Sequence, residues 1–158
     1  MHKGEPASGI EFFRLLHEDQ DFCAELGRAV LAAGRLEAEL NLYLSVTSVI
    51  HKDKRATLGK LLGVMKKEGT LKQMQPAIAM LKDQRNYLTH NIYGLFSGLI
   101  EESILPQSDL LDSDVDVFTD RAWQLAENLN GLADIVAKAN STHNKALQTT
   151  PLRGAAEC

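Results

Sequence analysis

The sequence contains few of the residues that build cross-linked or metal-bound folds. Its 158 residues include only two cysteines, Cys23 and Cys158, which lie far apart in the chain. That spacing excludes a disulfide framework and a zinc-ligand pattern, and so few cysteines favour a reducing compartment such as the cytoplasm. A Glu-x-x-His pair, the arrangement that holds two iron ions in helical bundles, is also missing. We therefore expect neither a metal ion nor another cofactor.

Long hydrophobic runs and regular repeats are missing as well. No apolar run approaches the roughly 20 residues that cross a bilayer, and residues 1–9 lack the apolar stretch of a secretory signal. No segment recurs at intervals of about 20–50 residues, which excludes solenoids and propellers. No segment alternates polar and β-branched apolar residues over the length of a strand. We expect a cytoplasmic protein with no membrane partner and no β-sheet.

The sequence does show clear helical periodicity. An apolar stripe that begins at Phe22 recurs every three or four residues as far as Tyr43, which predicts a long helix over residues 19–49. Ser8, followed three positions later by Glu11, predicts a short capped helix before it.

Three further helices follow from local start and stop signals. Thr57 and Gly69 bracket a third helix, and Pro76 lies in the first turn of a fourth. Ser113 or Asp114 begins the last helix. We predict an all-α fold, an antiparallel bundle of four main helices plus a short N-terminal helix, as a single domain over residues 1–139. Residues 140–158 lose the periodicity, so we expect a disordered tail there.

Charge is distributed unevenly along the chain, although the net charge is only −4 at pH 7. Residues 51–90 carry 9 Lys and Arg against 3 Asp and Glu. Residues 1–50 carry 4 against 8, and residues 91–158 carry 4 against 10. A basic block between two acidic ones is either a binding surface for an anion such as a nucleic acid or a set of surface lysines neutralised within the fold.

The predicted fourth helix carries the residues with the most chemistry. Arg85 interrupts its apolar stripe, and a buried arginine is costly unless its guanidinium is paired or faces a cleft. Lys82, Asn86, His90 and Tyr93 form a polar stripe on another face. On an ideal α-helix Arg85 and His90 lie about 140° apart around the axis, so they would act together only in a cleft beside the helix or across a two-fold axis.

These residue types suit metal-independent chemistry on a phosphodiester. Arg85 is a fixed cation that can bind a phosphate through two donors, and His90 can take and give protons near neutral pH. Asn86 would position either group, while Tyr87 and Tyr93 offer rings on which a base could stack.

Each of these residues also has a purely structural interpretation. Arg85 could form an internal ion pair, for which Glu37 on the second helix is a natural partner. His90 could be a hydrogen-bonded packing residue, and Tyr87 and Tyr93 could be core or interface aromatics.

The segment 85–90 resembles the motif of HEPN domains, in which an arginine and a polar residue precede a histidine by a few positions. Here Asn86 follows Arg85 directly and His90 closes the motif. Residues 34–37, which end in the acidic Glu37, and residues 58–62 are also similar to segments of HEPN sequences. The resemblance covers roughly residues 18–138.

The HEPN resemblance implies an antiparallel bundle that commonly dimerises so that two Arg–His motifs share a cleft. Many such proteins are metal-independent ribonucleases of toxin–antitoxin and phage-defence systems. In that role His90 would assist proton transfer at the ribose 2′-hydroxyl, and Arg85 would stabilise charge on the phosphate. Asn86 would orient or bind the substrate, and Glu37 would hold Arg85 or assist it.

Other members of the family are non-catalytic binding or antitoxin-like modules, so activity does not follow from the fold. The implied partners are a second copy of the chain, RNA, or an antitoxin-like protein. The ribonuclease hypothesis predicts that Arg85 and His90 face a basic cleft. The binding-module hypothesis predicts that Arg85 is paired internally with Glu37 and that His90 is occluded.

A second resemblance lies at the C-terminal end. Residues 144–158 resemble the read-through of an integron cassette recombination site. This implies a mobile bacterial accessory gene whose last residues serve DNA recombination rather than the fold.

Overall fold

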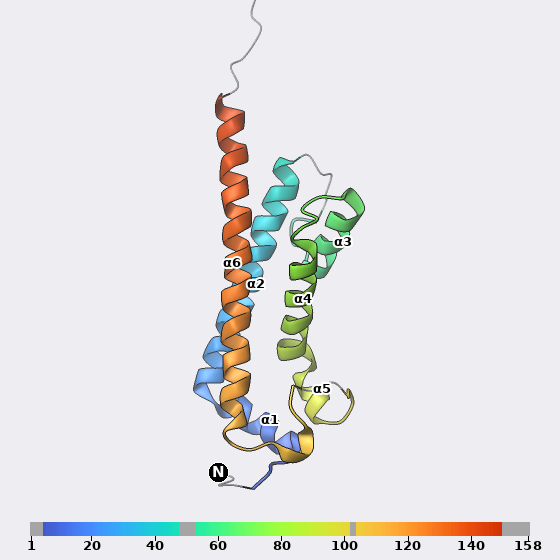
Figure 1. Cartoon of the computed structure of the whole chain (residues 1–158), viewed down its shortest axis with the longest axis vertical. Coiled ribbons are helices and arrows are strands. Elements are labelled where there is room, and N and C mark those ends of the chain that lie inside the picture. The colour runs from blue at the N-terminus through green and yellow to red at the C-terminus, as the bar shows by residue number, and fades with distance from the viewer. Residues whose placement is uncertain (1–4, 48–52, 102–103, 150–158) are drawn as a thin grey trace, which may run out of the picture.

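A computed structural model of the chain describes residues 5–47, 53–101 and 104–149 (Figure 1). Within these ranges the regular secondary structure is helical, apart from one isolated antiparallel bridge between Ala7 and Leu110. The predicted all-α class is therefore confirmed for the described residues. The helical elements in chain order are α1 (Gly9–Glu18), α2 (Gln20–Val46), α3 (Leu58–Glu68), α4 (Gln75–Asn86), the π-helical turn η1 (Tyr87–Asn91), α5 (Ile92–Phe96), the 3-10 turn η2 (Gln107–Asp109) and α6 (Asp114–Thr149).

Local sequence signals place the ends of several helices. The Ser8 hydroxyl accepts from the backbone N–H of Glu11, and the Glu11 carboxylate accepts from the N–H of Ser8, which confirms the predicted capping box of α1. Asp19 caps α2 by accepting from the N–H of Phe22 at 2.7 Å. Gly69 ends α3 in the left-handed region at φ 65°, as predicted, and Pro76 lies in the first turn of α4.

The two longest helices, α2 and α6, lie side by side and run in the same direction (Figure 1). Arg35 of α2 donates to Asn130 and Asp134 of α6, and further along the pair Asn140 of α6 donates to Glu39 of α2. Residue numbers therefore increase together along both helices. The predicted antiparallel arrangement is wrong for this pair.

Helix α4 runs opposite to α6. Residues early in α4, such as Met80, share a cavity with Gly131 of α6, whereas the later Gln84 shares one with Arg121. The antiparallel prediction is correct for this pair. The position of α3 explains the parallel α2–α6 pair. Helix α3 starts beside Glu37, in the middle of α2. Helix α4 then returns toward the α1 end of the bundle, and α6 begins at that end (Figure 1).

Aromatic side chains close the end of the bundle where α1 and α5 meet the start of α6. The ring centroids of Phe12 and Phe96 are 5.4 Å apart, and that of Phe118 lies 5.4 Å from Phe12 and 5.6 Å from Phe96. All three rings are buried. Edge-on and tilted contacts of this kind add to the stabilisation that comes from burial alone.

The last helix is longer than predicted. Helix α6 continues through Asn140 to Thr149, so the disorder expected for residues 140–149 is wrong. Asn140 is only 3% exposed, and its Nδ2 donates to the backbone carbonyl and the carboxylate of Glu39 at 3.1 and 2.8 Å. A polar residue that breaks the apolar stripe thus fixes the helix to its neighbour. Residues 150–158 of the predicted tail lie outside the described residues.

Candidate functional site

Arg85 lies near the end of α4 and is held from two sides. Its Nη1 lies 3.2 Å from Oε1 of Glu37, and the two side chains are only 18% and 22% exposed. Its Nη2 donates to Oδ1 of the neighbouring Asn86 at 3.1 Å. The internal partner suggested for Arg85 by the sequence is therefore in place, and the orientation of the guanidinium is fixed.

Glu37 has a second role that the sequence did not reveal. The same oxygen, Oε1, accepts from the backbone N–H of Leu58 at 2.8 Å. Leu58 is the first residue of α3, and the preceding Thr57 makes no side-chain capping hydrogen bond. The predicted Thr57 cap is therefore replaced by a carboxylate from α2, which also interacts favourably with the positive end of the α3 dipole. Glu37 connects α2, α3 and α4.

The chain leaves the α-helical path within the motif itself. Residues Tyr87–Asn91, which include His90, form the π-helical turn η1 between α4 and α5. A π-turn closes i→i+5 hydrogen bonds and winds more residues per turn than an α-helix. The separation of about 140° that holds on an ideal α-helix therefore does not apply. Because each residue of the wider turn rotates less around the axis, the angle between Arg85 and His90 is smaller than on an ideal α-helix.

The remaining motif residues divide into a packed group and an exposed one. The hydroxyl of Thr89 donates to the carbonyl of Arg85 at 2.7 Å, which satisfies an acceptor at the start of η1. His90 is exposed, and its imidazole makes no hydrogen bond or ion pair with the described part of the chain. Its accessibility differs from the occluded histidine of the binding-module hypothesis, whereas the Arg85–Glu37 pair agrees with that hypothesis.

The two tyrosines and Lys82 occupy different places. The hydroxyl of Tyr87 accepts from the backbone N–H of Ile104 at 2.6 Å, so this half-buried ring ties η1 to the segment before α6. Tyr93 is exposed and packs edge-on against Phe13, with ring centroids 5.0 Å apart. Lys82 forms an ion pair with Asp83 at 3.1 Å, and its aliphatic chain lies against Gly59 of α3. Of the three, Tyr87 is the one whose role is structural.

The basic block of the sequence forms an exposed surface on and around α3. Lys60 pairs with Asp53 at 3.3 Å. Lys66, Lys67 and Lys72 are exposed and form no ion pair within the described ranges. Neutralisation within the fold therefore does not account for these three charges. Lys82 of α4 lies against α3, but its charge is paired with Asp83, so the unpaired charges of this surface are those on and just after α3.

A cavity lies next to the Arg85–His90 motif but does not include these two side chains. It has a volume of about 300 Å³ between α4, η1 and α6, and its apolar walls are Tyr87, Leu88 and Ile104. Arg121 and Gln124 of α6 are at its rim, and neither Arg85 nor His90 lines it. One chain therefore presents Arg85 and His90 on a surface next to this cavity.

The described segments contain neither a membrane-spanning helix nor a cluster of metal ligands. No helix in them combines the length and the apolar character that crossing a bilayer requires. Their His, Cys, Asp and Glu side chains form no group of three or more that could hold a metal ion.

Sequence reasoning missed two features of this site. The capping of α3 by Glu37 joins residues that are 21 positions apart, and no local pattern predicts such a contact. The π-turn keeps the same apolar spacing that an α-helix would have, so periodicity does not distinguish the two. Comparisons with family models, with curated proteins and with solved structures gave no match for this chain.

Proposed function

We propose that this protein is a HEPN-like RNA-binding protein that cleaves RNA without a metal ion at the surface formed by Arg85, Asn86 and His90. The observation that carries the proposal is the π-turn, which has a fixed arginine just before it and an exposed histidine within it. Single π-turns inside helices are frequent at functional sites. Here the helix changes from α to π geometry within the motif, between Arg85 and His90.

Arg85 has donors left for a phosphate. A guanidinium carries five N–H groups. Glu37 and Asn86 each accept from one terminal nitrogen, while Nε is buried without a partner. The second N–H of each terminal nitrogen makes no hydrogen bond within the described residues and is a donor that a phosphate could use. A cation whose orientation is already fixed loses little freedom when it binds an oxyanion.

The proposed reaction needs only the RNA and these side chains. The ribose 2′-oxygen attacks the adjacent phosphorus and the bond from phosphorus to the 5′-oxygen breaks, which gives a 2′,3′-cyclic phosphate and a free 5′-hydroxyl. His90 accepts the proton of the 2′-hydroxyl and returns a proton to the leaving 5′-oxygen. Arg85 stabilises the negative charge that develops on the phosphate oxygens. Asn86 keeps Arg85 in position.

The basic surface supports RNA as the ligand. Lys66, Lys67 and Lys72 form no ion pair within the described residues and can pair with phosphates, and α3, which carries the first two, also contacts Lys82 of α4. Neutralising phosphates with lysines releases counterions, so RNA binding through this surface would weaken steeply as salt rises. Tyr93 is exposed close to His90 in the chain and is the tyrosine on which a base could stack.

The alternative function is that of a non-catalytic HEPN-like module that binds RNA or an antitoxin-like protein. The observation that favours it is the carboxylate of Glu37, which serves Arg85 and the first N–H of α3 together. This arrangement gives Arg85 a role in holding three helices that needs no substrate. A mobile accessory role, implied by the integron resemblance, is compatible with either function.

RNA cleavage by the purified chain in the presence of a chelator tests the proposal. We expect the wild type to release fragments with 2′,3′-cyclic phosphate ends, and His90→Ala to be slower by about 10²-fold or more. His17→Ala, which changes another exposed histidine on α1, is the matched control and should cleave like the wild type.

Two results separate the functions. RNA that binds to the wild type without being cut would support the binding module. Cleavage that survives both His90→Ala and Arg85→Lys would remove these residues from the mechanism. Equal growth of cells that express the wild type or His90→Ala would exclude a toxin that acts through this site.

A further inference from the structure

The face of α2 that points away from the core carries an uncharged stripe along most of the helix. The core-facing side includes Phe22, Ala29, Leu36 and Leu40, all buried. The opposite side has a second set of small and apolar residues at intervals of three or four positions. All are exposed, and they are Ala24, Gly27, Leu31, Gly34, Ala38 and Leu42.

Such a face is unusual for a helix on the outside of a bundle. An outer helix normally carries charged and polar residues opposite its buried stripe. Single exposed apolar residues are common and need no explanation, but a continuous uncharged strip along a 27-residue helix marks an interaction surface. Leu31, at the middle of the strip, has 76% of its surface exposed.

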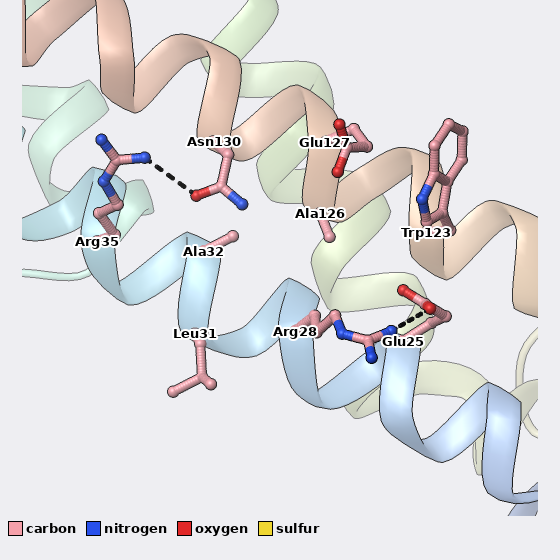
Figure 2. A pocket seen from close by; sticks show the side chains of 9 residues that line it. All are labelled: Glu25, Arg28, Leu31, Ala32, Arg35, Trp123, Ala126, Glu127 and Asn130. Carbon is pink, nitrogen blue, oxygen red and sulfur yellow. Dashed lines mark hydrogen bonds and ion pairs between the residues drawn. The ribbon is translucent and has the colours of Figure 1, made fainter.

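The charges beside the stripe are already neutralised within the chain. Arg28 pairs with Glu25, and Arg35 pairs with Asp134 at 2.6 Å and with Asn130 at 3.3 Å. These residues border a groove of about 490 Å³ between α2 and α6. Figure 2 shows Arg28 turned along α2 to Glu25 and Arg35 turned toward Asn130 of α6, while the side chain of Leu31, which also lines this groove, points away from α6. A partner that covers Leu31 therefore meets no unpaired charge on α2.

We propose that this face binds a second copy of the chain, with the two α2 helices packed antiparallel about a two-fold axis at Leu31. The order of the stripe is nearly the same in both directions. Gly27 and Gly34 lie four positions before and three positions after Leu31, and Ala24 and Ala38 lie seven before and seven after. A two-fold axis reverses the chain direction, so each copy presents to the other the pattern that it receives. An unrelated partner would have no need of this symmetry.

The glycines give the packing its geometry. A Cβ built at Gly27 or at Gly34 would have nothing within 4 Å, so both positions are shallow hollows on the surface of α2. In the antiparallel arrangement each Leu31 lies between Gly27 and Gly34 of the other copy, while Ala24 faces Ala38. Small residues on both sides of a leucine allow two helix backbones to approach closely.

The size of the strip predicts the strength of the dimer. A helix of this length extends about 40 Å, and a contact strip about 10 Å wide would bury roughly 800 Å² over both copies. This area lies somewhat below the roughly 1,000 Å² of a stable specific interface, in the range of weak and transient complexes. We therefore expect dissociation on the order of micromolar rather than an obligate dimer.

This inference does not rest on the proposed function. At about 100° per residue, Glu37 lies about 120° around α2 from Leu31, on the side of α4. Arg85 and His90 thus remain outside the interface. The arrangement also differs from the shared-cleft dimer that the HEPN resemblance implies, because the motif surfaces of the two copies do not meet.

Sedimentation of the full chain over about a hundredfold range of concentration around the micromolar tests the interface. Leu31→Glu should raise the dissociation constant by about tenfold or more, because two buried carboxylates would face each other at the axis. Leu99→Glu is the matched control, since Leu99 is 80% exposed in the segment after α5 and far from α2 in sequence. The control should dimerise like the wild type. A wild type that stays monomeric, or a dimer that Leu31→Glu leaves unchanged, would overturn the proposal.

Cross-linking then tests the direction of packing, independently of any loss of stability. In a chain with Cys23→Ser and Cys158→Ser, the single change Leu31→Cys should give an intermolecular disulfide under mild oxidation, and Leu99→Cys should not. Mixing Ala24→Cys with Ala38→Cys chains should give the mixed disulfide in excess over either symmetric one, because these positions face each other only when the helices are antiparallel. An excess of symmetric disulfides would overturn the two-fold axis at Leu31.

Discussion

The α2–α6 pair and the α4–η1–α5 segment are built from the same kinds of residue, yet only the second changes its helical pitch. Helices α2 and α6 are continuous, and buried apolar stripes hold them together along their length. The α4–η1–α5 segment also buries an apolar stripe, but soon after Arg85 it widens into a π-turn that contains Thr89 and His90. Regular geometry serves packing here, and the irregular turn occurs where polar groups are positioned. Departures of this kind are typical of functional sites.

The largest stability effect is expected inside the regular pair. Leu40 is fully buried on α2, so Leu40→Ala removes apolar contacts and leaves a cavity. We expect the free energy of unfolding to fall by about 2–5 kcal/mol, measured by urea denaturation. Met80→Ala, which truncates a half-exposed apolar side chain on α4, is a control that should cost much less. Equal losses would show that the two regions do not differ in packing.

The Glu37 carboxylate is the next largest contribution, and two substitutions divide its roles. Glu37→Ala removes the partner of Arg85 and the cap of α3 together, and we expect a loss of about 2–3 kcal/mol. Glu37→Gln keeps an oxygen for the N–H of Leu58 and loses only the charge, so its loss should be smaller. Urea denaturation of both variants, alone and with Arg85→Met, measures the coupling. Identical losses for the two Glu37 variants would assign the whole effect to the ion pair.

The extension of α6 should contribute about 1–2 kcal/mol through Asn140. Asn140→Ala deletes the two hydrogen bonds to Glu39, whose acceptors lie in a partly buried place. A chain that ends at residue 149 should unfold at the same denaturant concentration as the full chain, and one that ends at residue 139 should unfold earlier. If both shortened chains match the full one, the helix beyond Ala139 adds nothing to the pairing of α2 and α6.

The smallest stability effect is expected on the basic surface. Lys66→Gln combined with Lys67→Gln changes exposed side chains without an ion pair, so the free energy of unfolding should shift by less than about 0.5 kcal/mol. RNA binding should respond differently, because each lost phosphate contact lowers the slope of log K against log[salt] by about one. Lys138→Gln on α6 is a control that should leave that slope unchanged. An unchanged slope in the double variant would place the RNA elsewhere.

The sequence predicted best what depends on neighbours a few residues apart. The capping box at Ser8, the end of α3 at Gly69 and the position of Pro76 each follow from groups within one helical turn. The direction of α6 relative to α2 depends instead on where α3 starts along α2, and no local pattern predicts that position. The burial of Asn140 in the continued helix involves a contact with Glu39, about a hundred positions away.

The candidate site shows the same limit. Its residue types, and Glu37 as the partner of Arg85, were suggested by spacing on two amphipathic helices. The geometry of these residues was not predicted, because an α-helix and a helix with one π-turn bury the same apolar residues here. The groove between α2 and α6 was not predicted, because it depends on the parallel pairing of these two helices, which no local pattern indicates.

The sharing of one oxygen between Arg85 and Leu58 makes the site and α3 thermodynamically linked. An anion bound to the remaining donors of Arg85 competes with Glu37 for the guanidinium charge, so the shared oxygen becomes a stronger acceptor for the Leu58 N–H and the first turn of α3 is better capped as the site fills. By reciprocity, any change that strengthens the start of α3 favours anion binding at Arg85 to the same extent. Slower amide exchange at Leu58 would therefore report occupancy of a site on a different helix.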